Sequence, residues 1–179
     1  MKKKLTAFEI VRFAMLGSLM FVAKYLMQAI PNIHLTAMFI AAFTVVYRGK
    51  ALIPLYVYIL IDGVVGGFAM WWIPYLYIWL TLWAAVMLVS PVLERENVSA
   101  KTRTVIYMIL CALHGLTFGV MYAPAQALMY GLSFKATITW IAAGFWFDIA
   151  HGAGDFFMGA LVVPLVGLLR KLEKIDFRR

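Results

Sequence analysis

Long apolar runs recur through this sequence, and they constrain its fold more than any other feature. A helix needs roughly 20 apolar residues to cross a hydrocarbon core about 30 Å thick, and most of the runs approach that length. Hydrophobic residues make up 65% of the chain, well above the share typical of soluble domains. We therefore predict an all-α integral membrane protein, a compact bundle of six transmembrane helices. The predicted spans are Phe8–Ile30, His34–Tyr47, Ala51–Met70, Tyr75–Leu93, Thr104–Ala123 and a last one within Ala136–Leu169.

Basic residues lie at both ends of the chain and in every second connection between the predicted spans. Short cytoplasmic loops carry an excess of Lys and Arg, so this alternation predicts that both termini are cytoplasmic. The net charge of +8 follows from this topology and does not indicate nucleic-acid binding. The cations that define the pattern are Lys2, Lys3, Lys4, Arg12, Arg48, Lys50, Arg95, Lys101, Arg103, Arg170, Lys171, Lys174, Arg178 and Arg179.

We expect a single membrane-embedded domain over residues 1–179. The longest polar stretch, Glu94–Arg103, suits an inner loop, and the sequence contains no phosphate-binding loop of the P-loop kind. Any energy-dependent work therefore needs a partner. The single cysteine, Cys111, lies in an apolar run, so no disulfide or metal framework is predicted, and we expect neither a metal nor a cofactor.

A few ionisable residues fall inside the predicted spans. Such residues are costly in lipid, face the interior of a helix bundle and often serve a function. Lys24 and Asp62 lie near the outer ends of the first and third spans, at similar depths when counted at about 1.5 Å per residue. Because a pair costs less than either charge alone, we expect a structural ion pair between them.

The stretch WFDIAHGAGDFF, Trp146–Phe157, places two carboxylates and an imidazole in an apolar run. Asp148, His151 and Asp155 are spaced by three and four residues, which puts them on one face of a helix. Such a stripe can hydrogen-bond a ligand, relay a proton or bind a cation. The glycines between these residues permit a close neighbouring helix or a ligand against bare backbone.

Aromatic residues gather in the predicted outer connections, whereas the inner loops contain no tryptophan. Single aromatic residues at an interface serve as membrane anchors. A wall of them with a few fixed polar groups also suits a small planar ligand, since stacking provides contact area and hydrogen bonds provide orientation. The residues predicted to bind substrate are Asn32, His34, Trp71, Trp72, Tyr75, Trp79, His114, Tyr122, Gln126, Asp148, His151 and Asp155.

Together with six predicted spans in 179 residues, three short motifs resemble the substrate-binding S components of energy-coupling factor (ECF) vitamin transporters. AMLGSL at Ala14–Leu19 is similar to the small-residue segment of that family's first helix, with Ser18 in place of the more usual alanine. IPN at Ile30–Asn32 is similar to the point where the chain enters the lid loop. AHGAGD at Ala150–Asp155 is similar to the start of the last helix, where ligand-binding side chains lie.

The resemblance implies a binding subunit without enzyme activity in the cell membrane of a prokaryote. Such subunits bind a vitamin or a related heterocyclic precursor at the outer face, then dock on a membrane scaffold (T) protein that carries two cytoplasmic ATPases. Thiamine-like, pyridoxine-like and deazapurine-like solutes all suit the predicted site, and the sequence does not exclude riboflavin or cobalamin. Ala14, Gly17 and Ser18 form a smooth ridge where the scaffold would dock, or where another helix of the same chain would pack.

Two other functions fit parts of the sequence. GAGD at Gly152–Asp155 satisfies the GxGD pattern of intramembrane aspartyl proteases, in which Asp62 would supply the second carboxylate. Against this reading, Lys24 competes for Asp62, and the outer aromatic cluster has no purpose in peptide cleavage. A stand-alone proton-coupled secondary transporter would use Lys24, Asp62 and His151 as a proton path. Such carriers usually contain internal repeats, and we find no convincing one.

Overall fold

The computed structural model describes residues 5–30 and 32–175, and this part of the chain forms only helices and connecting loops. The predicted all-α class is therefore confirmed. The α-helices are α1 (Ala7–Leu26), α2 (Thr36–Tyr47), α3 (Leu52–Gly66), α4 (Tyr75–Leu93), α5 (Ala100–Leu116), α6 (Phe118–Tyr130), α7 (Phe134–Gly159) and α8 (Val162–Lys174), with short 3₁₀ helices η1 (Arg48–Ala51) and η2 (Met70–Trp72). The residues of the sequence analysis that lie outside the described part are Lys2, Lys3, Lys4, Pro31, Arg178 and Arg179.

Three helical stretches of the described chain are long and apolar enough to cross a membrane: Thr36–Gly66, Met70–Leu93 and Ala100–Tyr130. Helices α7 and α8 pass the same test only as a pair, which bends by 47° at a short break. By length and composition alone, the described residues thus contain three, or up to four, segments suited to span a membrane. These segments fit a transmembrane protein, while the arrangement of six spans stays a prediction.

Helix α2 forms the centre of the bundle. It packs against α4 and α8, and all its residues from Thr36 to Val45 are buried. Its 12 residues extend over about 18 Å, which is less than the thickness of a hydrocarbon core. A helix that is apolar on all sides is stable when protein surrounds it. Burial inside the bundle therefore explains how an all-apolar helix of this length is stable without crossing the membrane on its own.

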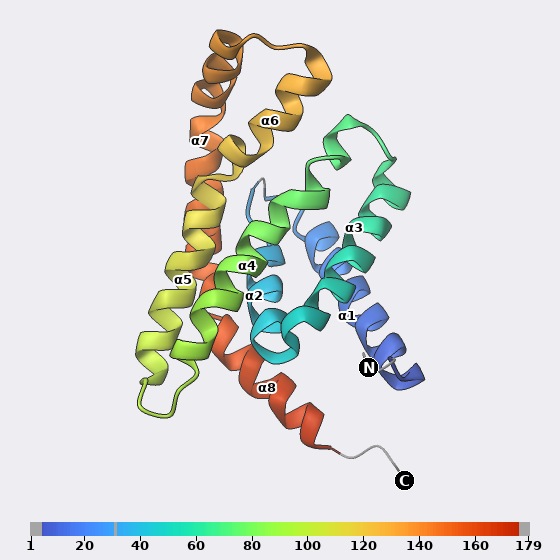
Figure 1. Ribbon diagram of the computed structural model, residues 1–179, viewed down its shortest axis with the longest axis vertical. Helices are drawn as coiled ribbons and strands as arrows, with labels where there is room; N and C mark the ends of the chain where they lie inside the picture. Colours follow the sequence, from blue (N-terminus) through green and yellow to red (C-terminus); the bar gives the residue numbers. More distant parts are fainter. Residues whose placement is uncertain (1–4, 31, 176–179) are drawn as a thin grey trace.

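Two of the predicted spans are interrupted. Helices α5 and α6 meet at Thr117, whose hydroxyl donates to the carbonyl of Leu113 at 2.7 Å, a contact that often bends helices. The last predicted span, within Ala136–Leu169, consists of two helices, because α7 ends at Gly159 and α8 continues at an angle. Figure 1 shows α6 and the first half of α7 as a hairpin that extends beyond the other helices.

The connections alternate between the two ends of the bundle (Figure 1). The turn between α2 and α3, the α4–α5 loop and the end of α8 lie in the lower part of this view, on the same side as the start of α1. The α1–α2, α3–α4 and α6–α7 connections lie toward the other end. The basic connections around Arg48 and at Glu94–Arg103 therefore share one end of the molecule with the C-terminal helix.

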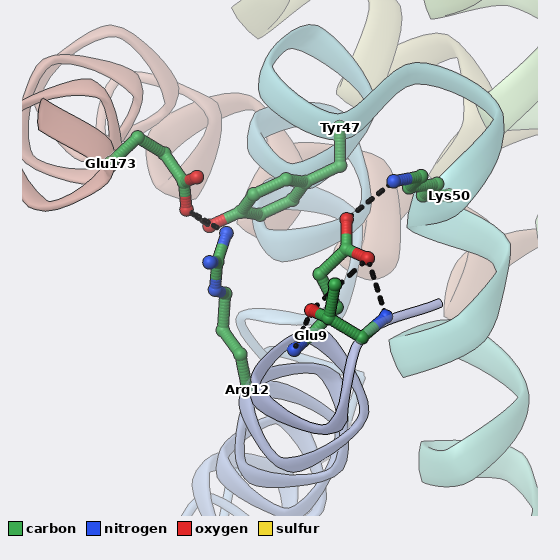
Figure 2. Close-up of polar contacts among 6 residues, drawn as sticks. Glu9, Arg12, Tyr47, Lys50 and Glu173 are labelled. Carbon is green, nitrogen blue, oxygen red and sulfur yellow. Dashed lines mark hydrogen bonds and ion pairs between the residues drawn. The ribbon is translucent and has the colours of Figure 1, made fainter. Parts of the chain in front are cut away.

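Polar side chains join the helices at this basic end, as Figure 2 shows. Arg12 of α1 donates to the carboxylate of Glu173 on α8, and the hydroxyl of Tyr47 donates to the same oxygen at 3.1 Å. Lys50 of η1 forms an ion pair with Glu9 of α1. Exposed ion pairs contribute little individually, so we infer that the network mainly sets the relative positions of α1, α2 and α8.

Helices α5 and α7 make the most extensive contact in the bundle, and glycines make it close. A Cβ atom added at Gly115 of α5 would lie 2.8 Å from the backbone nitrogen of Gly152 on α7. Small residues allow two helix backbones to approach in this way. The glycines of the α7 stripe predicted a close neighbouring helix, and α5 is that helix. The contact fixes the position of His151 relative to α5.

Substitution of Gly115 by alanine should destabilise the protein by about 1–3 kcal/mol, because the added methyl group overlaps backbone atoms of α7. Gly144→Ala on α7 is the matched control, since no atom lies within 4 Å of a Cβ placed there. That change should leave stability unchanged or raise it by up to about 1 kcal/mol. Thermal unfolding of both variants in one detergent measures the difference, and equal melting temperatures would contradict the close packing of α5 and α7.

Candidate functional site

A pocket of about 230 Å³ lies among the α1–α2 loop, α3, α4, α6 and α7. In Figure 1 the loop after α1, the start of α4 and the α5–α6 junction meet at this level, toward the end opposite the basic connections. Its lining combines aromatic rings with an ammonium group, two amides and two imidazoles. The lining residues are Lys24, Met27, Gln28, Ile30, Asn32, Ile33, His34, Tyr58, Tyr75, Trp79, Phe118 and His151.

The loop between α1 and α2 contributes much of this lining. Asn32 has a φ of 58°, a conformation that asparagine adopts more readily than most residues. Ile33 lies against α7, where a Cβ added at Gly154 would be 3.0 Å from the Ile33 side chain. The bare backbone at Gly154 therefore lets the loop rest on α7. As a result, the rings of His34 and His151 lie next to each other, with their centroids 4.9 Å apart.

Aromatic rings form another part of the lining. Trp79 is only 1% exposed, and its ring centroid lies 5.8 Å from that of Tyr75 and 5.5 Å from that of Phe118. The ring of His114, which does not line the pocket, stacks on Trp79 at 5.2 Å. Contacts of this kind hold a ring in one orientation, so the pocket has a largely fixed aromatic surface.

Lys24 and Asp62 form an ion pair at the pocket. The Lys24 Nζ donates to Asp62 Oδ2 at 2.6 Å, which joins α1 to α3, and lies 5.2 Å from the centroid of the Tyr75 ring. The two side chains are 20% and 8% exposed, so solvent screens the pair only in part. This is the ion pair expected from the sequence. Because Lys24 also lines the pocket, the pair contributes charge to the site as well as a link between helices.

His151 and Asp155 place a second polar group at the site. His151 lines the pocket, and its Nε2 lies 3.5 Å from Oδ2 of Asp155, one turn further along α7. Asp155 is fully buried, at 0% exposure. Within the described chain, neither of its carboxylate oxygens accepts a hydrogen bond. A buried carboxylate with so few partners is costly in free energy, so this position calls for a functional explanation.

The structure brings together part of the predicted set. Five of the predicted substrate-binding residues line the pocket, and Asp155 lies next to one of them. Those five are Asn32, His34, Tyr75, Trp79 and His151. The residues that the structure does not bring to this pocket are Trp71, Trp72, His114, Tyr122, Gln126 and Asp148.

Three of these other aromatic residues are used in packing the α3–α4 connection. The indole nitrogen of Trp72 donates to the carbonyl of Ile59 at 2.7 Å, which fastens η2 to α3. The hydroxyl of Tyr122 donates to the carbonyl of Trp71 at 3.1 Å, which fastens η2 to α6. The side-chain hydrogen bonds of Trp72 and Tyr122 direct these two rings into the scaffold around the site. The Trp71 ring lies 5.8 Å from the Lys24 ammonium group, next to the pocket lining.

Asp148 has a structural partner as well. Its Oδ1 accepts a hydrogen bond from the backbone nitrogen of Gly119 at 3.0 Å, in the first turn of α6. The first N–H groups of a helix need such acceptors, because they have none within the helix. Asp148, His151 and Asp155 are all buried on α7, as the predicted stripe requires. Only His151 reaches the pocket, while Asp148 holds the start of α6.

The small residues of α1 point in different directions. A Cβ added at Gly17 would lie 2.7 Å from the carbonyl oxygen of Pro54, so this glycine serves the contact between α1 and α3. Ala14 and Ser18 are exposed on the outer side of the same helix. The predicted ridge is thus divided between a contact within the chain at Gly17 and a free surface at the other two residues.

Several lining residues were not among those predicted to bind substrate. Phe118 and Tyr58 lie in apolar runs, where nothing in the composition distinguishes a lining ring from a core ring. The spacing of four residues between His114 and Phe118 is the one available signal, since it indicates a shared helix face. Met27 and Gln28 follow α1 and reach the pocket only because the chain turns there.

None of the family models, curated proteins and solved structures compared with this chain matches it. The pocket's own geometry must therefore support any functional interpretation. An aromatic surface, a paired ammonium group, loop amides and two adjacent imidazoles can bind a small polar ring compound and orient it.

Proposed function

We propose that this protein is a membrane-embedded binding subunit for a small water-soluble heterocyclic solute of vitamin-like chemistry. The observation that carries the proposal is the pocket itself, in which fixed aromatic rings and polar side chains converge in a strongly apolar chain. Sites for small molecules combine these two kinds of lining, because apolar area provides affinity and a few polar groups provide orientation.

The size of the pocket favours a small solute. Its volume of about 230 Å³ is below the range of about 300–1,000 Å³ typical of sites for drug-sized ligands. Tyr75, Trp79 and Phe118 offer ring surfaces and edges, while Asn32 and the two histidines offer donors and acceptors. This lining suits a compact heterocycle with several nitrogen or oxygen atoms better than a long or purely apolar molecule.

We further propose that uptake of the solute depends on an ECF-type energising module, a scaffold (T) protein with two ATPases. The basic connections lie at one end and the tryptophan-rich α3–α4 connection at the other, which supports a six-span topology with cytoplasmic termini. Ala14 and Ser18 lie exposed on α1, where small side chains permit another helix to approach closely. The proposed module would supply the ATP hydrolysis that drives release to the cytoplasm.

The protease alternative receives less support from the contacts. A shared proton requires two carboxylates that interact with each other. Asp62 instead pairs with Lys24, and the ionisable neighbour of Asp155 is His151 rather than a second carboxylate. The stand-alone transporter differs from the proposal in its energy source, so uptake by the chain alone in liposomes, without ATPases, would favour it.

Native mass spectrometry of the detergent-purified protein tests the binding function. We expect an additional small mass on the wild-type chain, released on collisional activation. Asn32→Gly should reduce the fraction of chains that retain this mass severalfold, because it removes a lining amide while glycine tolerates the positive φ. Gln126→Ala, which removes an amide outside the pocket, is the matched control.

The two possible failures of this experiment are informative. A folded wild-type chain that carries no organic mass after growth in rich medium would contradict the binding function. Equal retention by Asn32→Gly and Gln126→Ala would place the solute elsewhere in the protein.

A further inference from the structure

We propose that His34, His151 and Asp155 bind a divalent transition-metal ion, with Zn²⁺ as its simplest representative. Each of these residues offers one ligand atom, and the three atoms lie within 4.8 Å of one another. His34 belongs to the α1–α2 loop and the other two residues to α7, so the ion would join the loop to the longest helix. The proposal goes beyond the binding of an organic solute and does not depend on it.

The spacing of the donor atoms fits a metal ion. Two donors at about 2.1 Å from a tetrahedral zinc ion lie about 3.4 Å apart. The Nε2 of His151 and the Oδ2 of Asp155 are 3.5 Å apart, which matches this separation without any movement. No two of the three ligand atoms are more than 4.8 Å apart, so the widest separation exceeds the tetrahedral value by at most about 1.4 Å. Because His34 lies in a loop rather than a helix, a small displacement of its ring would complete the set.

All three residues also have unsatisfied polar atoms. Among the described residues, the Nδ1 of His34, the Nε2 of His151 and both oxygens of Asp155 are buried without a hydrogen-bond partner. His151 is 4% exposed and Asp155 is 0% exposed, so solvent does not satisfy them either. Native proteins rarely leave so many buried polar atoms unpaired at one place. A bound cation would provide the missing partner for one atom of each residue.

The charges also favour a cation. Asp155 has no lysine or arginine partner in the described part of the chain, and the nearest basic group is the His151 imidazole at 3.5 Å. The nearby ammonium group of Lys24 is already paired with Asp62 at 2.6 Å. A divalent ion would therefore compensate the buried carboxylate and bind the two neutral imidazoles.

The donor set indicates the class of metal. Imidazole nitrogen suits zinc, nickel, copper and iron, whereas magnesium and calcium prefer all-oxygen ligands. Two histidines and one carboxylate leave a fourth tetrahedral position open, as in zinc sites that bind an exchangeable ligand. His34 and His151 line the pocket, so the pocket gives the ion a route to the site.

Zinc binding to the chelator-treated, detergent-purified full chain tests the proposal. We expect one equivalent of Zn²⁺ per chain, and a higher melting temperature when zinc is present, because binding stabilises the folded state. Asp155→Asn, which keeps the shape of the side chain, should weaken zinc binding by at least about 100-fold, the upper end of the loss seen when an outer partner of a ligand is removed. Co²⁺ in place of zinc should give the visible absorption of a tetrahedral site.

His114→Gln is the matched control, because His114 is an equally buried histidine outside the cluster. It should retain one equivalent of zinc. His34→Gln provides a second test that does not alter the helical core, should Asp155→Asn fail to fold. The proposal is overturned when folded wild-type protein binds no zinc, or when Asp155→Asn and His34→Gln bind it as tightly as the control. Neither result bears on the organic solute, because this assay measures bound zinc alone.

Discussion

Asp62→Leu is expected to lower the free energy of unfolding by about 3–5 kcal/mol, because it leaves the Lys24 ammonium group unpaired in a mostly apolar setting. Lys24→Met should have a similar effect by leaving the Asp62 carboxylate unpaired. The double variant should be close to the wild type, since methionine and leucine can pack where the pair was. For a chain of this size, a loss of that magnitude lowers the melting temperature by roughly 6–20 °C.

A double-mutant cycle measured by thermal unfolding in one detergent gives the coupling energy directly. Lys135→Met is the matched single-charge control, because Lys135 is exposed at the start of α7. Its effect should remain within about 0.5 kcal/mol. Additive effects of Asp62→Leu and Lys24→Met, with no recovery in the double variant, would show that the 2.6 Å contact does not exist in solution.

Trp79→Ala is expected to cost about 3–5 kcal/mol and to abolish retention of the proposed solute. The side chain is almost completely buried and contacts the rings of Tyr75, His114 and Phe118. Removing it deletes part of the pocket lining and the surface on which neighbouring rings are held. Melting temperature and native mass spectrometry measure the two effects on the same samples.

Trp146→Ala is the control for this prediction, because Trp146 is 75% exposed on α7. It should retain the solute and most of the stability. Trp79→Phe separates the effect on solute binding from the effect on stability. It keeps an aromatic ring and loses less buried area than Trp79→Ala, so it should be the more stable of the two variants. If Trp146→Ala loses the solute and Trp79→Ala retains it, the binding site lies instead on the hairpin formed by α6 and the first half of α7.

Spacing within a helix predicted some features of the site well. Asp148, His151 and Asp155 share a buried face of α7 because residues three and four apart on a helix are neighbours. The Lys24–Asp62 contact follows from two isolated charges at similar depths, each of which needs a partner in an apolar bundle. Both inferences use only local geometry and the cost of burying charge.

The number and length of the spans were harder to predict. Apolar composition does not distinguish a helix buried in protein, such as α2, from one that faces lipid, because both surroundings are apolar. The break at Thr117 between α5 and α6 is likewise invisible in the hydropathy pattern. The six predicted spans therefore correspond to eight α-helices of unequal length in the described chain. One of them, α2, extends over only about 18 Å, which is shorter than a membrane span.

By itself, the sequence determined the class of protein, the stripe on α7 and the need for ion pairing, since hydropathy, helical spacing and charge are local properties. Only the tertiary structure decided which polar groups meet. His34 reaches His151 and Asp155 because the α1–α2 loop rests on the bare backbone of Gly154, while α7 is held to α5 at another glycine. These approaches depend on backbone contacts between distant segments, and such contacts leave no periodic signal in the sequence.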